Sequence, residues 1–305
     1  MRALVTGGSG FVGTVLCRRL LESGTKVRVA VHRRTPDLGG VEIVEVGPMS
    51  STTEWDAALD GVDHVFHLAG LAHGKYPVRQ LMETNVAGTA RLVESAEVAG
   101  VSRFLFLSSI KVCGDVSTRP FRAIDLPSPT DAYGRSKALA EEAVRATRAR
   151  WTIVRSPLVY GPGVRGNFKT ILDAIDRGRI LPVGSATGRR DFIFVENLAD
   201  AILFLARFTE AEYEVVHVRD GETLELRAFV TRIADAMGTS AKICAVPPSL
   251  LRMALFLIGR KSVASRLLDS LEIDDSEIRD MGWKPPFTVE EGIRLTVATA
   301  RGSIR

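Results

Sequence analysis

The stretch TGGSGFVG, residues 6–13, decides the fold of this chain. It follows a short apolar run at 2–6 and leads into 11–22, where apolar residues recur at helical spacing. Glycine at positions 7, 10 and 13 allows a tight turn, close approach of backbone N–H groups to a pyrophosphate, and close packing of a helix on a strand. The spacing is G-x-x-G-x-x-G, and its place at the first strand–helix junction predicts a dinucleotide-binding βαβ unit.

Strand and helix patterns alternate outward from that turn. Apolar, strand-like runs lie at 2–6, 27–31, 41–46, 62–70, 103–109 and 151–156. The segments between them predict helices at 11–22, 53–60, 78–99 and 132–148. Strands joined by helices of this length are typical of an α/β fold with a doubly wound parallel sheet, the Rossmann arrangement, and right-handed crossovers.

The pattern loosens after Pro157. Two stretches with Gly and Pro, LVYGPGVRGN at 158–167 and LPVGSATGRRD at 181–191, indicate loops. The remaining patterns predict strands at 192–195 and 213–218 and helices at 167–178, 196–207, 224–237 and 249–258, with a last helix after GWKPPFTVEEGI (282–293).

We therefore expect two parts in the molecule. Residues 1–156 and 190–218 form a dinucleotide-binding Rossmann domain, and residues 157–189 and 219–305 form a smaller C-terminal substrate-binding lobe. Because open α/β sheets bind ligands at the carboxyl edge of their strands, the lobe should lie over that edge.

The composition excludes several classes of protein. Hydrophobic residues make up 46% of the 305 residues, which supports a sizeable core. The formal net charge of +4 comes from dispersed basic residues, which do not indicate nucleic-acid binding and suit an anionic small substrate or ordinary surface charge. The three cysteines form no C-x-x-C pair, so neither a disulfide framework nor a zinc site is expected. The N-terminal residues enter a strand at once, which predicts no signal peptide and a cytoplasmic protein.

Two further segments invite a functional interpretation. The histidines of DHVFHLAGLAH (63–73) lie on a strand that runs into a glycine turn, not on a helix, so we expect no metal ligands there. SLLRMALFLIGRK (249–261) is apolar between basic residues, but about ten apolar residues are too few to span a bilayer. We expect a core helix there, with an interfacial anchor and peripheral membrane contact as the alternative.

The motif YGRSK places Tyr133 and Lys137 four residues apart, on one face of a helix. A nearby ammonium lowers the pKa of a phenol, and such a tyrosine exchanges a proton with a carbonyl or alcohol. The lysine also has the length to reach a cofactor ribose. An ordinary surface pair is the alternative.

The motif SSIKVCG (108–114) ends the strand at 103–109. A hydroxyl at the carboxyl edge of the sheet is placed to bond the substrate oxygen that Tyr133 addresses. We assign this role to Ser109 and expect Ser108 to be structural.

Together these motifs resemble the extended short-chain dehydrogenase/reductase superfamily, the nucleotide-sugar branch that includes UDP-galactose 4-epimerase. The resemblance covers almost the whole chain, since the family's order is kept by eight motifs: TGGSGFVG, HLAG (67–70), TNVAGTARL (84–92), SSIKVCG, YGRSK, RSPLVYGPG (155–163), RRDFIFVENLADAI (189–202) and GWKPPFTVEEGI. The family's S-S-x-x-V-Y-G motif matches with Cys113 in place of the tyrosine. The resemblance also implies a homodimer formed through the helices at 78–99 and 132–148.

The resemblance and the glycine turn together assign the site residues. The catalytic group is Ser109, Tyr133 and Lys137. Substrate contacts are Ser109, Asn167, Arg190 and Arg266, where the guanidinium of Arg190 suits bidentate binding of a diphosphate. Cofactor contacts are expected from Gly7, Gly10, Phe11, Val12, Gly13, His32, Arg33, Arg34, Leu68, Ala69, Gly70, Asn85, Tyr133, Lys137 and Pro157. The family's acidic residue after the third strand is missing, since Gly47 and Pro48 stand there, and adenine recognition is left open.

The stretch VAVHRRTP (29–36) bears on the choice of cofactor. A carboxylate at the end of the second strand bonds the 2′-hydroxyl of NAD, whereas an arginine nearby suits a 2′-phosphate. His32, Arg33 and Arg34 stand there without an acid, which favours NADP(H); NAD(H) is the alternative if the arginines are solvated.

A cofactor that exchanges at each turnover indicates a reductase. SSIKV, the short lobe and the apolar helix resemble C4-reductases of UDP-4-keto-6-deoxy-N-acetylhexosamines. We expect hydride transfer to C4 of a UDP-4-keto-6-deoxy-(N-acetyl)hexose in surface polysaccharide precursor synthesis. The alternative is an NAD-dependent UDP-hexose or N-acetylhexosamine 4-epimerase, acting on a lipid-linked sugar if the apolar helix docks on membrane. A dehydratase fits less well, because Ile110 and Lys111 follow Ser109 where an acidic pair is usual, and a silent nucleotide sensor would lack the Tyr/Lys pair.

Overall fold

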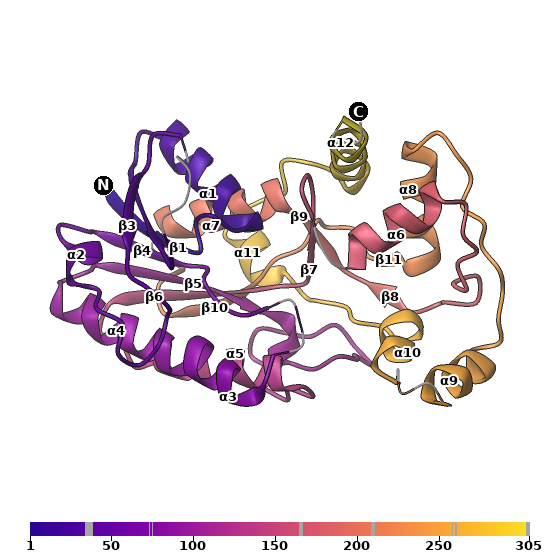
Figure 1. The fold of residues 1–305 in the computed structure, drawn as a ribbon, viewed down its shortest axis with the longest axis horizontal. Helices are drawn as coiled ribbons and strands as arrows, with labels where there is room; N and C mark the ends of the chain where they lie inside the picture. The colour runs from indigo at the N-terminus through magenta and orange to yellow at the C-terminus, as the bar shows by residue number, and fades with distance from the viewer. Residues whose placement is uncertain are drawn as a thin grey trace.

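The structure, a computed structural model, describes residues 1–33, 39–72, 74, 76–164, 167–208, 211–257, 259 and 261–302. For residues 167, 261, 262, 266 and 302 it describes the backbone alone. Figure 1 shows a sheet layered between helices on one side of the molecule and a group of helices with short strands on the other.

The central sheet has seven parallel strands in the order β10-β6-β5-β4-β1-β2-β3. Its register pairs Thr6 with His67 and Ser109 with Ser156, so the carboxyl ends of β1, β4, β5 and β6 lie along one edge. The predicted doubly wound parallel sheet is confirmed. The strands are β1 (Arg2–Thr6), β2 (Lys26–Val31), β3 (Glu42–Glu45), β4 (His64–His67), β5 (Arg103–Ser109), β6 (Arg150–Ser156) and β10 (Glu214–His217).

Helices cover both faces of this sheet (Figure 1). On one face α1 (Phe11–Glu22) packs against α7 (Val195–Arg207), with Leu16, Leu20 and Leu198 fully buried. Each such side chain contributes about 1.5–3 kcal/mol when removed from water. The other face is covered by α2 (Asp56–Leu59), α4 (Gly88–Val98) and α5 (Ala132–Arg145).

The single helix predicted at 78–99 is interrupted. It begins as α3 (Val78–Leu81), passes through a π-helical turn at Met82–Ala87, and continues as α4. The π turn carries Asn85, and a π turn within a helix often marks a functional position.

The C-terminal lobe has two small sheets, which include Arg190 and residues 192–194 from the segment predicted to belong to the Rossmann domain. The parallel pair is β7 (Leu158–Tyr160) with β9 (Phe192–Phe194), and the antiparallel pair is β8 (Arg189–Arg190) with β11 (Leu224–Glu225). The prediction of a loop at 158–167 is wrong for β7, because a three-residue strand shows no periodicity of its own and forms only with its distant partner.

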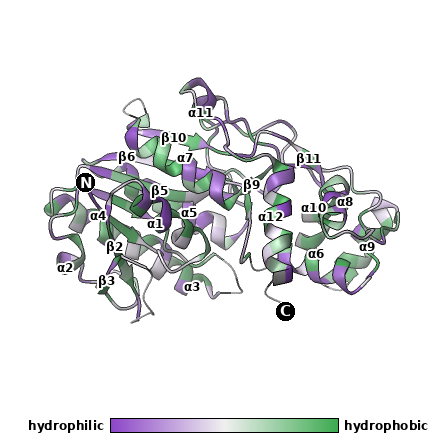
Figure 2. Cartoon of the chain, turned by 90° about the horizontal axis from the view of Figure 1, so that it is seen from above, coloured by the Kyte–Doolittle hydropathy of each residue, from purple (hydrophilic) through white to green (hydrophobic). Residues whose placement is uncertain are grey.

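Helices complete the lobe, and Figure 2 shows α12 between them and the sheet side. Aromatic side chains form much of their core, with Phe192 and Phe229 stacked at 3.9 Å between ring centroids. The sequence did not predict α10 and α11, which are short. The helices of the lobe are α6 (Asn167–Asp176), α8 (Leu226–Ala236), α9 (Pro248–Leu257), α10 (Lys261–Leu268) and α12 (Val289–Gly302). By contrast, α11 (Ser276–Asp280) packs against β10, and its Ile278 is buried in the core of the sheet side.

The prediction that 249–258 is a core helix is also wrong. In α9 only Leu251 is buried, and Leu255 is partly buried against the lobe core. Leu250, Met253, Phe256 and Leu257 are 51–75% exposed. The helix lies at the margin of the lobe, so only one narrow face meets protein. Among the described residues, no helix is long and apolar enough to cross a bilayer.

Candidate active site

The glycine turn is shaped to receive a phosphate group. Gly7 has φ +71, and a Cβ there would lie 2.8 Å from the Ala69 amide nitrogen; a Cβ on Gly13 would lie 2.1 Å from the Gly7 carbonyl oxygen. Gly10 differs, because its Cβ would meet only the Gly7 carbonyl oxygen, at 3.1 Å, and would otherwise fill open space.

The helix that follows the turn begins without a competing anion. Gly10 is the N-cap of α1, no side chain caps it, and the first turn holds no acid. The first amides of a helix have no intrahelical partner and carry the positive end of its dipole. The backbone N–H groups of Phe11, Val12 and Gly13 are therefore available to a pyrophosphate, and their predicted cofactor contacts stay a prediction.

The three predicted catalytic residues come together at the sheet edge. Ser109 ends β5, while Tyr133 and Lys137 lie on α5, which packs against that strand. Burial raises the pKa of Tyr133 to about 12, and a hydrogen bond with the Ser109 side chain acts in the opposite direction. The Ser109 and Tyr133 side chains are therefore in hydrogen-bond contact.

Lys137 differs from its expected role. Its ammonium donates to the Leu107 carbonyl at 2.7 Å and lies 3.9 Å from the centroid of the Phe106 ring. The side chain is 4% exposed, and burial lowers its pKa to about 7. The negative charge of Glu141 acts in the opposite direction and raises that pKa. We expected Lys137 to lower the pKa of Tyr133; in this structure the opposing contact on the phenol comes from Ser109 instead.

Lys111 and Asp131 join the two halves of the catalytic group. The sequence did not predict this positioning role. Asp131 caps α5 by accepting from the Gly134 amide at 2.7 Å, and the same carboxylate pairs with Lys111. Lys111 follows Ser109 by two residues, and its amide donates to the Ser109 hydroxyl at 3.3 Å. The pair fixes the start of the Tyr133 helix against the loop after Ser109. The sequence carried one indication of this contact, because an acid two residues before Tyr133 is typical of a helix N-cap.

Asn85 is a positioning residue in this structure. Its amide oxygen accepts from the Leu71 amide at 2.8 Å, and its nitrogen donates to the Leu71 carbonyl and to the Ser136 hydroxyl. Ser136 in turn donates to the Tyr133 carbonyl at 2.8 Å. Asn85 thus joins the loop after Gly70 to the Tyr133 helix, and its predicted cofactor contact stays a prediction.

His67 links Thr6, at the start of the glycine turn, to Thr89 on α4. Thr89 donates to the Asn85 carbonyl at 2.7 Å, so its hydroxyl oxygen accepts from His67 Nε2. Nδ1 then accepts from Thr6, whose oxygen accepts from the Ala69 amide. Burial lowers the pKa of His67 to about 3, so the ring is neutral. Both ring nitrogens are therefore occupied by structural contacts, and the one through Thr6 positions Ala69.

A buried ion pair lies directly under the catalytic group. Arg155 donates to both oxygens of Glu141, at 2.9 and 2.7 Å, and Ser108 donates to Glu141 at 2.6 Å. Arg155 is 1% exposed and Glu141 is fully buried. Burial alone raises the pKa of Glu141, but Arg155 outweighs it and holds that pKa below its usual range. Ser108 is therefore structural, as expected.

The remaining cofactor positions line the same edge. His32 and Arg33 follow β2 and are exposed, while Arg34 lies outside the described residues. Leu68 and Ala69 are partly buried after β4, and Pro157 is buried directly after β6.

The predicted substrate residues belong to the lobe. Arg190 on β8 donates to the Ser265 carbonyl of α10 at 3.1 Å, and α10 contains Arg266. Asn167 is the first residue of α6. The side chains of Asn167 and Arg266 lie outside the described residues.

A network of ion pairs and hydrogen bonds lies beside Arg190, and the sequence did not predict it. Asp191 accepts from Thr223 at 2.7 Å and pairs with Arg219, which also pairs with Asp275. Asp191 also accepts from the Ile273 amide at 2.6 Å. These contacts fix β8 against the chain segment after α10.

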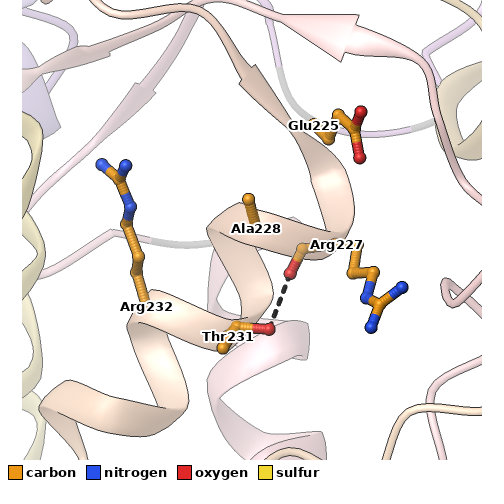
Figure 3. A pocket seen from close by; sticks show the side chains of 5 residues that line it. All are labelled: Glu225, Arg227, Ala228, Thr231 and Arg232. Atoms are coloured by element: carbon orange, nitrogen blue, oxygen red, sulfur yellow. Dashed lines mark hydrogen bonds between the residues drawn. The ribbon is translucent and has the colours of Figure 1, made fainter.

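A shallow surface pocket on α8 lies apart from these residues. Arg232 there pairs with Glu222 at 2.6 Å, and Thr231 donates to the Arg227 carbonyl (Figure 3). None of the predicted site residues lines it. Its lining is Glu225, Arg227, Ala228, Thr231 and Arg232.

A family model described as the NAD dependent epimerase/dehydratase family matches residues 3–218. The chain belongs to the NAD dependent epimerase/dehydratase family. A UDP-glucose 4-epimerase from Vibrio cholerae is 34% identical to it, covering 96% of this chain and 93% of that protein. An N-acetyl-alpha-D-glucosaminyl-diphospho-ditrans,octacis-undecaprenol 4-epimerase from Escherichia coli O157:H7 is 26% identical over the same shares. The solved Thermus thermophilus UDP-glucose 4-epimerase complex with NAD is 25% identical, covers 99% of this chain and 100% of that one, and has a TM-score of 0.80.

Membership of the epimerase/dehydratase family confirms the resemblance to extended short-chain dehydrogenase/reductases. The protein is an NAD-dependent enzyme of the nucleotide-sugar branch. The glycine turn and the Ser109–Tyr133–Lys137 group are the parts of the chain that fit this chemistry.

Proposed function

We propose that the protein is a 4-epimerase of a UDP-hexose or UDP-N-acetylhexosamine that retains NAD through its cycle. The observation that carries this proposal is the hydrogen-bonded Ser109–Tyr133 pair at the sheet edge, with Lys137 one helical turn along α5. The similarity to two sugar 4-epimerases over 96% of the chain supports the same reaction.

In this proposal, NAD supplies the hydride acceptor for C4 when it is bound. Tyr133 takes the proton of the sugar 4-hydroxyl, and Ser109 donates a hydrogen bond to the same oxygen. The resulting 4-keto sugar would rotate in the site, so that C4 takes the hydride back on its opposite face while Tyr133 returns the proton to O4. The chain's share of the catalysis is therefore proton transfer and orientation.

The diphosphate of the substrate would be held by the lobe. Arg190 has the forked donor set that suits a diphosphate, and its guanidinium already donates to the Ser265 carbonyl of α10. The neighbouring Asp191 ties this segment to Ile273 by accepting from its amide. We propose Asn167 and Arg266 as further contacts of the diphosphate. A lipid-linked sugar diphosphate presents the same phosphate chemistry as a UDP-sugar, so these residues do not distinguish the two.

A second candidate is the C4-reductase of a UDP-4-keto-6-deoxy-(N-acetyl)hexose with NADP(H), favoured by one observation. The exposed His32 and Arg33 after β2 offer no carboxylate to a ribose 2′-hydroxyl and would attract a 2′-phosphate. Two solved proteins that are 25% identical to this chain carry NAD in their names, so we place this candidate second.

Two expectations accompany the proposal. A homodimer would form through the segments 78–99 and 132–148, and cytoplasmic localisation would suit the three free cysteines.

The test uses the purified protein with UDP-galactose or UDP-N-acetylgalactosamine and no added nucleotide. We expect the C4 epimer to appear, as seen by NMR of the sugar anomeric protons, and Tyr133→Phe to abolish it. Turnover only of a 4-keto-6-deoxy sugar, with consumption of NADPH, would replace the epimerase by the reductase.

A further inference from the structure

We propose that α9 docks the protein onto the surface of a lipid bilayer that contains anionic lipids. The proposal stands independently of the reaction. It rests on the exposed face of α9, on the charge of the surrounding chain, and on the place of the helix in the molecule.

The outward face of α9 is apolar. Leu250, Met253 and Leu257 recur at spacings of three and four residues, so they form one stripe, and Phe256 lies beside it. Their exposed fractions are 51%, 56%, 75% and, for Phe256, 65%. Helices on the surface of water-soluble domains normally show the opposite pattern, with the apolar stripe turned inward. A contiguous exposed apolar stripe of this kind is typical of an interaction surface.

The chain around this stripe is strongly basic. No Asp or Glu occurs between Asp235 and Asp269, and the same interval contains Lys242, Arg252, Arg260, Lys261 and Arg266. The whole chain, by contrast, has 36 acidic against 40 basic residues. Apolar side chains flanked by Lys and Arg match the acyl boundary and the anionic headgroups of a bilayer surface.

The dimensions favour an interfacial position. A ten-residue helix is about 15 Å long, which is half the thickness of a hydrocarbon core and excludes a span. The helix lies at the end of the lobe farthest from the sheet (Figure 1), so a flat surface can reach it.

The inner side of α9 is anchored in the lobe. Leu251 is buried and Arg252 pairs with Asp269, while α9 packs on α10. Since Arg190 donates to the Ser265 carbonyl of α10, the docking helix and the lobe's diphosphate residue belong to one connected unit.

A second copy of the chain fits this face less well. A two-fold interface places the same surface of both copies together, so the basic interval of one copy would meet the basic interval of the other. Like charges at such a contact oppose association, whereas an anionic bilayer attracts them.

The test is flotation of the full-length protein with vesicles of phosphatidylcholine alone or of phosphatidylcholine and phosphatidylglycerol in equal parts. We expect the wild-type protein to float with the anionic vesicles only and to be released at high salt. The double substitution Phe256→Gln and Leu257→Gln should reduce the bound fraction by at least about tenfold, because two large apolar side chains no longer enter the interface. The matched control is Ile124→Gln with Leu126→Gln, which are 73% and 86% exposed elsewhere on the surface.

Both double variants replace exposed side chains, so equal thermal midpoints and equal nucleotide content establish that the fold is intact. Wild-type protein that stays off anionic vesicles, or an α9 variant that floats as well as wild type, overturns the proposal. Sedimentation velocity gives a further arm: an oligomer that the α9 variant dissociates would show that a second copy covers the stripe, which also overturns it.

Discussion

A buried ion pair lies beneath each half of the site, and the two are built differently. Under Ser109 and Tyr133, Arg155 pairs with Glu141 between a long central strand and the helix that covers it. Beside Arg190, Arg219 pairs with both Asp191 and Asp275, which come from short segments far apart in the sequence. On the sheet side, the hydrogen bonds between long strands fix the position of the strand that carries Ser109, and the ion pair helps to orient the helix that carries Tyr133. In the lobe, where strands are two or three residues long, the side-chain network itself holds the segments together.

The largest effect should come from the sheet side. Tyr133→Phe removes the proton carrier, so turnover should fall by about 10²- to 10⁴-fold. NAD content should stay unchanged, as measured by nucleotide released on denaturation. The lobe offers a matched control in Tyr160→Phe, because Tyr160 is buried and donates to Asp220 at 2.7 Å, away from the catalytic group. That variant should lose about 1–3 kcal/mol of stability and keep its turnover. Equal losses of turnover in both variants would contradict the division of roles.

Glu141→Gln should be the most destabilising change to the sheet-side ion pair. It leaves the Arg155 charge buried without its carboxylate, which costs about 3–5 kcal/mol of unfolding free energy. Chemical denaturation measures this loss. Glu142→Gln, the exposed neighbour on α5, should change the unfolding free energy very little. If both variants unfold alike, the ion pair does not support the site.

The buried Lys137 should give a pH-dependent effect on stability. Burial lowers its pKa from 10.5 to about 7 in the folded protein. Between these values the unfolded chain holds a proton that the folded chain has released, so this residue makes the wild type more stable as pH rises. Lys137→Met carries no proton. In protein freed of nucleotide, the stability of the variant relative to wild type should be greatest below pH 7 and shrink toward pH 10. A difference that stays constant with pH would show that Lys137 keeps its ordinary pKa.

Asp191→Asn should have the smallest effect of the four, about 1–3 kcal/mol, because Arg219 keeps Asp275 as a partner. The KM for the UDP-sugar should rise with less change in kcat, since the loss falls on β8 and Arg190. Asp176→Asn, exposed at the end of α6, is the control. A loss of unfolding free energy as large as that of Glu141→Gln would contradict the expected difference between the two networks.

Sequence patterns predicted the sheet side closely. The bounds of β1, α1 and β5 are those that apolar periodicity and the glycine turn indicated, because each element is long enough to show its own pattern. The sequence also brought Ser109, Tyr133 and Lys137 together, since strand ends and helix faces follow from those bounds.

The lobe could not be predicted in the same way. β7 forms only where it meets β9, more than thirty residues later, and α9 was placed in the core because its composition does not tell which face meets protein. The contacts of Lys111, Asp191 and His67 depend on which loops the fold brings together. The position of the Leu107 carbonyl could not be predicted from sequence either. We therefore expected the Lys137 ammonium to act on the phenol of Tyr133, whereas it donates to this carbonyl.

The central claim, a 4-epimerase that keeps its NAD, is tested most directly by the nucleotide that the purified protein releases on denaturation, identified by mass. We expect NAD in a one-to-one ratio with the protein, and the same ratio in Tyr133→Phe. Protein that releases no nucleotide, or that releases NADP, would contradict it and would favour the reductase that His32 and Arg33 indicate.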